Sequence, residues 1–264
     1  HVRARKPAAA FATVNVGVAL GVVPPLGLNV NDATVPTELK LYAQKQADGG
    51  TRETGALHRS YAIVKGFLAP RRLNCGFGGN AELSIDAIVL HDGSANNPII
   101  EADAASLASG IADAERFTLG PVTLESVALP QIRSVEIDFG LVLDLEGSDA
   151  DIYPTMATIR SVAPRITLRG IDIEWLKSTN IPFTGKVATH ANTKIFLRKR
   201  TQDGASFVAD ATTQHLKFTA AGFVHVEQAF GAGGQELAEV NLVMETKYDG
   251  TNNPLVYAAN VAIV

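Results

Sequence analysis

Apolar and polar residues alternate with a period of two over several long stretches of the chain. In residues 135–146 the odd positions are Val, Ile, Phe, Leu, Leu and Leu, and the even positions are Glu, Asp, Gly, Val, Asp and Glu. Residues 166–176 repeat this alternation, and so do residues 12–20. Successive side chains of a β-strand point to opposite faces, so the pattern predicts strands with one buried face and one polar face.

A helical pattern is weak by comparison. The best candidate covers residues 102–114, where Ala, Leu and Ile recur at helical spacing and Gly110 can bend the helix. One short helix among many strands predicts a mainly β chain, built as a β-sandwich or barrel.

One phrase occurs twice in the chain, with the same order of neighbours around each copy. HDGSANNPI stands at 91–99 and YDGTNNPL at 248–255. Each copy is preceded by a Gly-Phe start, a Gly-Gly pair and an alternating run, and is followed by an apolar run. Further upstream, LKLYAQKQADGG at 39–50 parallels KIFLRKRTQDGA at 194–205. We therefore predict an internal duplication, with an abbreviated antiparallel β module at 1–110 and a related, longer one at 111–264.

The repeated phrase carries turn chemistry and lacks reactive side chains. An Asp-Gly pair tolerates the positive φ angles of a tight hairpin turn, and Asn-Asn-Pro then favours an extended exit. We expect Asp92 and Gly93 in the first copy, and Asp249 and Gly250 in the second, to shape the backbone.

Composition and motifs argue against an enzyme. The net charge of −4 is unlike that of a protein that neutralises many phosphates, and the single cysteine, Cys75, excludes an internal disulfide framework. The six histidines form no HxH or HExxH pair, and no GxSxG is present. The Gly-rich loops at 76–80 and 230–234 match neither GxGxxG nor a P-loop. We predict no catalytic residue, no cofactor and no metal.

Two charged runs leave alternatives open. Residues 144–151 hold four acids in eight residues and could surround calcium, but their spacing does not follow the EF-hand loop, which favours a solvated acidic turn. Residues 194–200 are basic, which is compatible with nucleic acid binding. Ile195 and Leu197 alternate with charge there, so we favour an exposed edge strand guarded by Lys and Arg.

The chain resembles the tail tube proteins of long-tailed bacteriophages in two regions. In that family a strand runs into a Y-D-G-T-N turn near the C-terminus, as residues 244–251 do here. A middle segment, IRSVEIDFG…SDADIYPTMATIRSVAPRITL at 132–168, is similar to the family's alternating strands and the short loop before P-x-I. The resemblance covers the last 150 residues or so, and reaches the first 110 through the internal repeat.

The resemblance implies a structural virion protein of the phage tail that binds copies of itself and other tail proteins. Family subunits are β-sandwiches whose inner sheets join into a closed barrel, and the rings stack into a tube. Six modules make a ring, so a tandem chain implies a trimer and a single-module chain a hexamer. The channel passes DNA as transient, non-specific cargo along an acidic wall, and no membrane is involved.

Two sets of residues receive roles on this basis. The residues expected to face the channel are the even-numbered acids of one strand, Glu136, Asp138, Asp144 and Glu146. The residues expected to contact acidic groups of the adjacent ring are the basic ones of the second run, Lys194, Arg198, Lys199 and Arg200.

Other functions are compatible with the same β pattern. The chain could be a different virion protein, such as a baseplate hub, distal tail or capsid-decorating protein. A carbohydrate- or calcium-binding β-sandwich is a further alternative. That alternative needs aromatic side chains gathered on one face, whereas only 6% of the residues are aromatic and Trp175 is the single tryptophan.

Overall fold

The computed structural model of the 264-residue chain is mainly antiparallel β-sheet, as the alternation predicts. It describes residues 2–5, 39–44, 58–63, 65–91, 97–105, 115–171, 174–175, 179, 181, 188–201, 203–231, 239–247 and 254–264. The strands in chain order are β1 (Val2–Arg5), β2 (Leu39–Gln44), β3 (His58–Ile63), β4 (Lys65–Gly76), β5 (Glu82–Leu90), β6 (Ile99–Ala105), β7 (Phe117–Leu124), β8 (Val127–Ala128), β9 (Ile132–Asp138), β10 (Leu141–Glu146), β11 (Met156–Val162), β12 (Arg165–Gly170), β13 (Ala188–Lys199), β14 (His215–Gly231), β15 (Glu239–Thr246) and β16 (Leu255–Val261).

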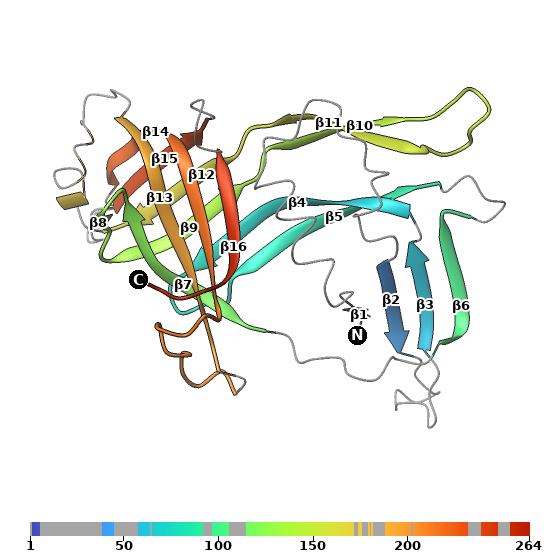
Figure 1. Ribbon diagram of the computed structural model, residues 1–264, viewed down its shortest axis with the longest axis horizontal. Helices are drawn as coiled ribbons and strands as arrows, with labels where there is room; N and C mark the ends of the chain where they lie inside the picture. Colours follow the sequence, from blue (N-terminus) through green and yellow to red (C-terminus); the bar gives the residue numbers. More distant parts are fainter. Residues whose placement is uncertain are drawn as a thin grey trace.

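The strands form one large sheet, one small sheet and one ribbon (Figure 1). The large sheet has the order β5-β4-β9-β12-β15-β14-β13-β7-β8, and β16 also pairs with β14. The small sheet has the order β1-β2-β3-β6. The β10–β11 ribbon reaches toward one end of the long axis of the molecule.

The large sheet curves around a single main core. Val122 on β7, Val135 on β9 and Leu168 on β12 belong to the same buried cluster, although β7 and β9 are far apart in the strand order. The turn after β4 meets the start of β7, because the Ala81 amide donates to the Phe117 carbonyl at 2.7 Å. Burial of each such apolar side chain contributes roughly 1.5–3 kcal/mol before the entropy cost is subtracted. This curvature gives the larger sheet its barrel-like form.

Three expected elements differ from the structure, and the strand expected at 12–20 lies outside the described residues. Residues 102–105 of the predicted helix are strand, because β6 pairs with β3 through Ser60 and Ala102, and residues 106–114 lie outside the described residues. Among the described residues, helical geometry is confined to Glu174 and Trp175. The strand expected at 166–176 therefore ends at Gly170, over which the buried Trp175 ring packs so closely that a Cβ would clash with it.

The strand expected at 135–146 is two strands. β9 belongs to the large sheet and β10 to the ribbon, and Phe139 and Gly140 lie between them. Gly140 has a φ of 55°, and a Cβ there would clash with the carbonyl of Ala163. The backbone needs glycine at this bend, which the alternation alone did not show.

The two copies of the sequence repeat have matching strand partners. In the first half, β3 lies between β2 and β6, and in the second half the first part of β14 lies between β13 and β16. Leu39 pairs with Ile63 in β2–β3, and at the corresponding positions Lys194 pairs with Thr219 in β13–β14. The β3–β6 ladder corresponds to the β14–β16 ladder. The register of the second is displaced by one residue relative to that of the first.

The second pair of ladders corresponds more closely. Gly66 of β4 pairs with Val89 of β5, and Gly222 of β14 pairs with Thr246 of β15. Both ladders have a β-bulge between the residues four and six positions after the glycine. A Cβ on either glycine would clash with a carbonyl oxygen of the facing strand, that of Ile88 for the first glycine. The corresponding carbonyl for the second glycine is that of Glu245. Close strand approach therefore explains the repeated glycine of the Gly-Phe motif.

Candidate assembly surfaces

Glu136 and Asp138 lie on the polar face of the large sheet. Their neighbours Val135 and Ile137 point into the core, so the acids point away from it. Directly paired residues of neighbouring strands lie on the same face of a sheet. Thr167 of β12 pairs with Glu136, so the polar face continues from β9 onto β12. The charged residues on this face near Glu136 are Glu82, Asp138, Glu227 and Glu245, with Arg72, Arg165 and Arg169, and the face continues to Lys217 of β14 and Lys194 of β13.

Partners of these two acids are close. The Glu136 carboxylate lies 3.4 Å from the Arg72 guanidinium, and the Asp138 carboxylate accepts the Gly140 amide at 3.0 Å. Partly exposed ion pairs of this kind contribute little to stability. The face is polar and mixed in charge.

Asp144 and Glu146 lie on a different element. They belong to β10 of the ribbon, where Asp144 is 3.8 Å from Arg160 of β11, and Glu146 is exposed. The structure thus brings the four predicted channel residues together only in two pairs, one on the large sheet and one on the ribbon.

The basic run 194–200 does not lie on a sheet edge. β13 is hydrogen bonded to β14 on one side and to β7 on the other, so the expectation of an exposed edge strand is wrong. Ile195, Phe196 and Leu197 are all buried. Three consecutive apolar residues are typical of a strand covered on both faces, and this signal was present in the sequence.

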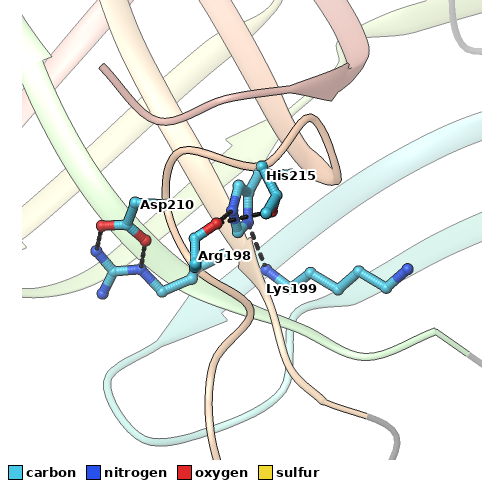
Figure 2. Close-up of polar contacts among 6 residues, drawn as sticks. Arg198, Lys199, Asp210 and His215 are labelled. Atoms are coloured by element: carbon cyan, nitrogen blue, oxygen red, sulfur yellow. Dashed lines mark hydrogen bonds and ion pairs between the residues drawn. The ribbon is translucent and has the colours of Figure 1, made fainter.

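Three of the four basic side chains have partners within the chain, and Lys194 is half-buried beside them. Arg198 makes two parallel hydrogen bonds to the Asp210 carboxylate, both at 2.8 Å (Figure 2). The Lys199 ammonium lies 2.7 Å from the Glu115 carboxylate. Arg200 donates to the carbonyls of Gly204 and Gly78, at 3.2 and 3.1 Å.

His215 completes the same cluster (Figure 2). Its Nδ1 accepts the Lys199 amide at 3.0 Å, and its Nε2 lies 3.1 Å from the Ala209 carbonyl, to which it donates. The ring is fully buried. These contacts hold the segment after β13 against the sheet, so the basic cluster has an observed role within the subunit.

The four turn residues of the repeated phrase, Asp92, Gly93, Asp249 and Gly250, lie outside the described residues.

The tip of the ribbon exposes apolar side chains on an ordered turn, which the sequence did not single out. Ile152 is 88% exposed. The Asp151 carboxylate accepts the Ser148 amide at 2.7 Å and the Ser148 hydroxyl at 2.9 Å. These bonds, the amide bond above all, lower the pKa of Asp151 below its usual value. Tyr153 stacks near His91, with ring centroids 6.0 Å apart. The turn therefore presents Ile152 in a defined position.

An apolar groove of about 420 Å³ lies near the turn after β4. Phe77, which is 79% exposed, forms part of its wall. Its other apolar lining comes from β7, the start of β9 and the residue after β12, and Arg133 adds a positive charge. The apolar lining residues are Phe77, Leu119, Pro121, Ile132 and Ile171.

β5 is an open edge of the large sheet. Within the described residues its only strand partner is β4. Leu83 and Ile85 of β5 are 40% and 39% exposed. An open edge that carries apolar side chains can pair with another strand.

Two observations concern metal ligands and the single cysteine. They contain no group of three or more His, Cys, Asp or Glu side chains placed to hold a metal ion. Cys75 is buried, and its burial raises the thiol pKa to about 12, so the reactive thiolate is disfavoured. Among the described residues there is also no helix with the length and apolar character needed to cross a membrane.

Comparison of the sequence with models of known protein families and with curated proteins finds no match.

Proposed function

We propose that this chain is a structural protein of a bacteriophage tail, and that it assembles with copies of itself into rings that stack as a tube. The activity is assembly, and the chain is not an enzyme. Other tail proteins would bind the ends of the tube, and DNA would pass through it without sequence-specific contacts.

One observation carries this proposal: the matching β4–β5 and β14–β15 ladders of the two copies of the repeat lie in one large sheet. β4 of the first half pairs with β9 of the second half, from Arg72 opposite Asp138 to Gly76 opposite Ser134. The same sheet therefore runs from the first copy to the second through β9 and β12, which lie outside the repeated segments. A chain whose sheet continues across two related ladders has the geometry needed to extend that sheet into a further copy.

The open edge gives this extension a physical reason. Exposed backbone donors and acceptors on a long edge strand favour pairing with another strand, and closure into a ring removes such edges. If the two halves are equivalent modules, three chains supply the six modules of a ring. Head-to-tail contacts that do not close on themselves continue as a filament, as a tube requires.

The polar face of the large sheet supports a channel-facing role for Glu136 and Asp138. Carboxylates repel the phosphates of a passing DNA strand, whereas Lys and Arg clusters hold them. Asp144 and Glu146, on the ribbon, remain predictions of the same role.

Electron microscopy and sedimentation of the purified full chain test the proposal. We expect concentration-dependent growth into stacked rings with a central hole in negative stain, and sedimentation coefficients that rise with protein concentration. A single monomeric species at every concentration tested, up to the solubility limit, would rule the proposal out.

A further inference from the structure

We propose that the ribbon tip of one copy inserts Ile152 into the apolar groove of the next copy, and that this contact joins subunits head to tail. The inference rests on the proposed function, because it names a contact through which self-assembly proceeds. The occupant of the groove is a second copy of this chain.

The exposure of the tip is the first argument. A large apolar side chain that is 88% exposed loses water contact favourably when a partner covers it. Tyr153, next to Ile152 in the turn, is 45% exposed, and Val142 and Leu145 of β10 are 45% and 49% exposed. The ribbon therefore exposes several apolar side chains.

The order of the tip is the second argument. Asp151 holds the turn through Ser148, and the Thr155 amide donates to the Glu146 carbonyl at 3.0 Å. The tip is also held against the end of β5, because the His91 amide donates to the Pro154 carbonyl at 2.8 Å. A side chain on an ordered turn loses less entropy on binding than one on a loose loop.

Complementary charge is the third argument. The tip carries Glu146, Asp149 and Asp151, all exposed. The groove lining includes the exposed Arg133, whereas the charge of Arg198, also in the lining, is already paired with Asp210. Opposite charges at the rim of an apolar contact steer the partners together and set their orientation.

The positions of the two surfaces are the fourth argument. In Figure 1 the β10–β11 ribbon reaches one end of the long axis, whereas β7 and β8 lie toward the other end. The groove is lined by β7, the start of β9 and the turn after β4. A projection and a groove on different parts of one molecule cannot meet within the same copy. Their contact therefore joins two copies, and it propagates head to tail when the two copies do not exchange tips symmetrically.

Substitution of the projection is the first test. Ile152→Ser removes the apolar group from an exposed turn, so we expect the fold to be unchanged and the self-association constant to fall at least tenfold in sedimentation velocity. Ile99→Ser is the matched control, because Ile99 is 47% exposed and lies on β6 of the small sheet, outside both the ribbon and the groove lining. The control should associate as the wild type does.

Charge exchange is the second test. Asp149→Arg and Arg133→Glu should each weaken association, and the double variant should recover at least part of the loss. Recovery would identify the two side chains as partners, whereas equal or greater loss in the double variant would contradict the pairing.

Crosslinking gives a readout that does not depend on affinity. A chain with Ile152→Cys and Pro121→Cys should form disulfide-linked dimers and higher multimers under mild oxidation, since the native Cys75 is buried. A chain with Ile99→Cys and Pro121→Cys should not form the same ladder, because Ile99 lies on β6 of the small sheet, outside the ribbon.

The outcomes separate this inference from the proposed function. If the wild type assembles but Ile152→Ser assembles equally well and the cysteine pair does not crosslink, the contact is wrong and the assembly function stands. If the wild type stays monomeric, the proposed function fails and the contact fails with it.

Discussion

The two copies of the sequence repeat have matching strand ladders, but the side chains of these ladders differ in how deeply they are buried. Ile85 of β5 and Leu242 of β15 occupy corresponding positions, opposite Pro70 and Val226 just before the shared bulge. Leu242 is fully buried, whereas Ile85 is 39% exposed. The two copies therefore share a ladder geometry, and elements outside the repeat determine whether the side chains of that ladder are buried.

The cover over the second half comes from strands that the repeat does not contain. Leu242 packs in the main core with side chains of β7, β9 and β12, and β15 is also paired with β12 at its edge. β5 lacks such a neighbour among the described strands. This difference makes the second half the main core of the subunit and leaves the first half with an open edge.

The largest expected effect is a difference between corresponding core positions. Leu242→Ala should lower the free energy of unfolding by about 2–5 kcal/mol, because it leaves a cavity in a packed core. Ile85→Ala should change it by about 0.5 kcal/mol or less, as at other exposed positions. Urea unfolding of the unassembled chain measures both. Equal losses would mean that β5 is covered in solution, and the comparison between the halves would fail.

A smaller effect should be alike in the two halves. Gly66→Ala and Gly222→Ala each place a methyl group against a carbonyl of the facing strand, so each should cost about 1–3 kcal/mol. Thermal unfolding of the two variants measures the loss. Gly79→Ala is the control, since its nearest non-neighbouring atom is 3.8 Å away and it should be nearly neutral.

Unequal losses at the two glycines would be informative. If only Gly222→Ala destabilised the chain, the first ladder would not contribute to the measured transition. The two ladders would then have the same backbone register but would contribute unequally to the free energy of unfolding.

The sequence predicted several of the strands because alternation is a local signal, and it did not predict which strands pair. Alternation placed β9, β12 and β15 correctly in part, and the Gly-Phe motif marked the corresponding points of close strand approach. Residues 102–105 were predicted as helix because an Ala-rich segment has helical spacing. Pairing with β3 outweighed that preference, since strand formation depends on the neighbours more than on intrinsic propensity.

A candidate surface could be predicted from the sequence only where all of its residues lie on one strand. Glu136 and Asp138 lie on a polar face, as their alternation indicates, but Gly140 sends Asp144 and Glu146 to another sheet. The groove combines Phe77, Pro121 and Ile171, which are far apart in sequence. Such a surface follows from the curvature of the sheet, which no local pattern encodes. Ile152 follows an acidic turn, and its exposure was not evident from its residue type.

The smallest expected effect is a pH dependence confined to the second half. His190 of β13 is buried, and this burial lowers its pKa below 6.5, although Glu125 lies 3.8 Å from Nδ1 and opposes the shift. The unfolded chain therefore binds a proton more readily than the folded chain, so stability is lost as the pH falls below about 6.5. His190→Gln cannot take this proton, and its midpoint of urea unfolding should fall less than that of the wild type between pH 7.5 and pH 5.5.

Glu125→Gln tests the contribution of Glu125, whose charge raises the pKa of His190 and so opposes the effect of burial. The Glu125 carboxylate accepts the Ala191 and Asn192 amides at 2.5 and 3.3 Å, and a glutamine oxygen can keep these bonds while the negative charge is lost. Without that charge the pKa of His190 should fall further, and the loss of stability on acidification should grow. A pH dependence that is unchanged in both variants would show that groups elsewhere in the chain control it, and that the buried histidine does not distinguish the second half from the first.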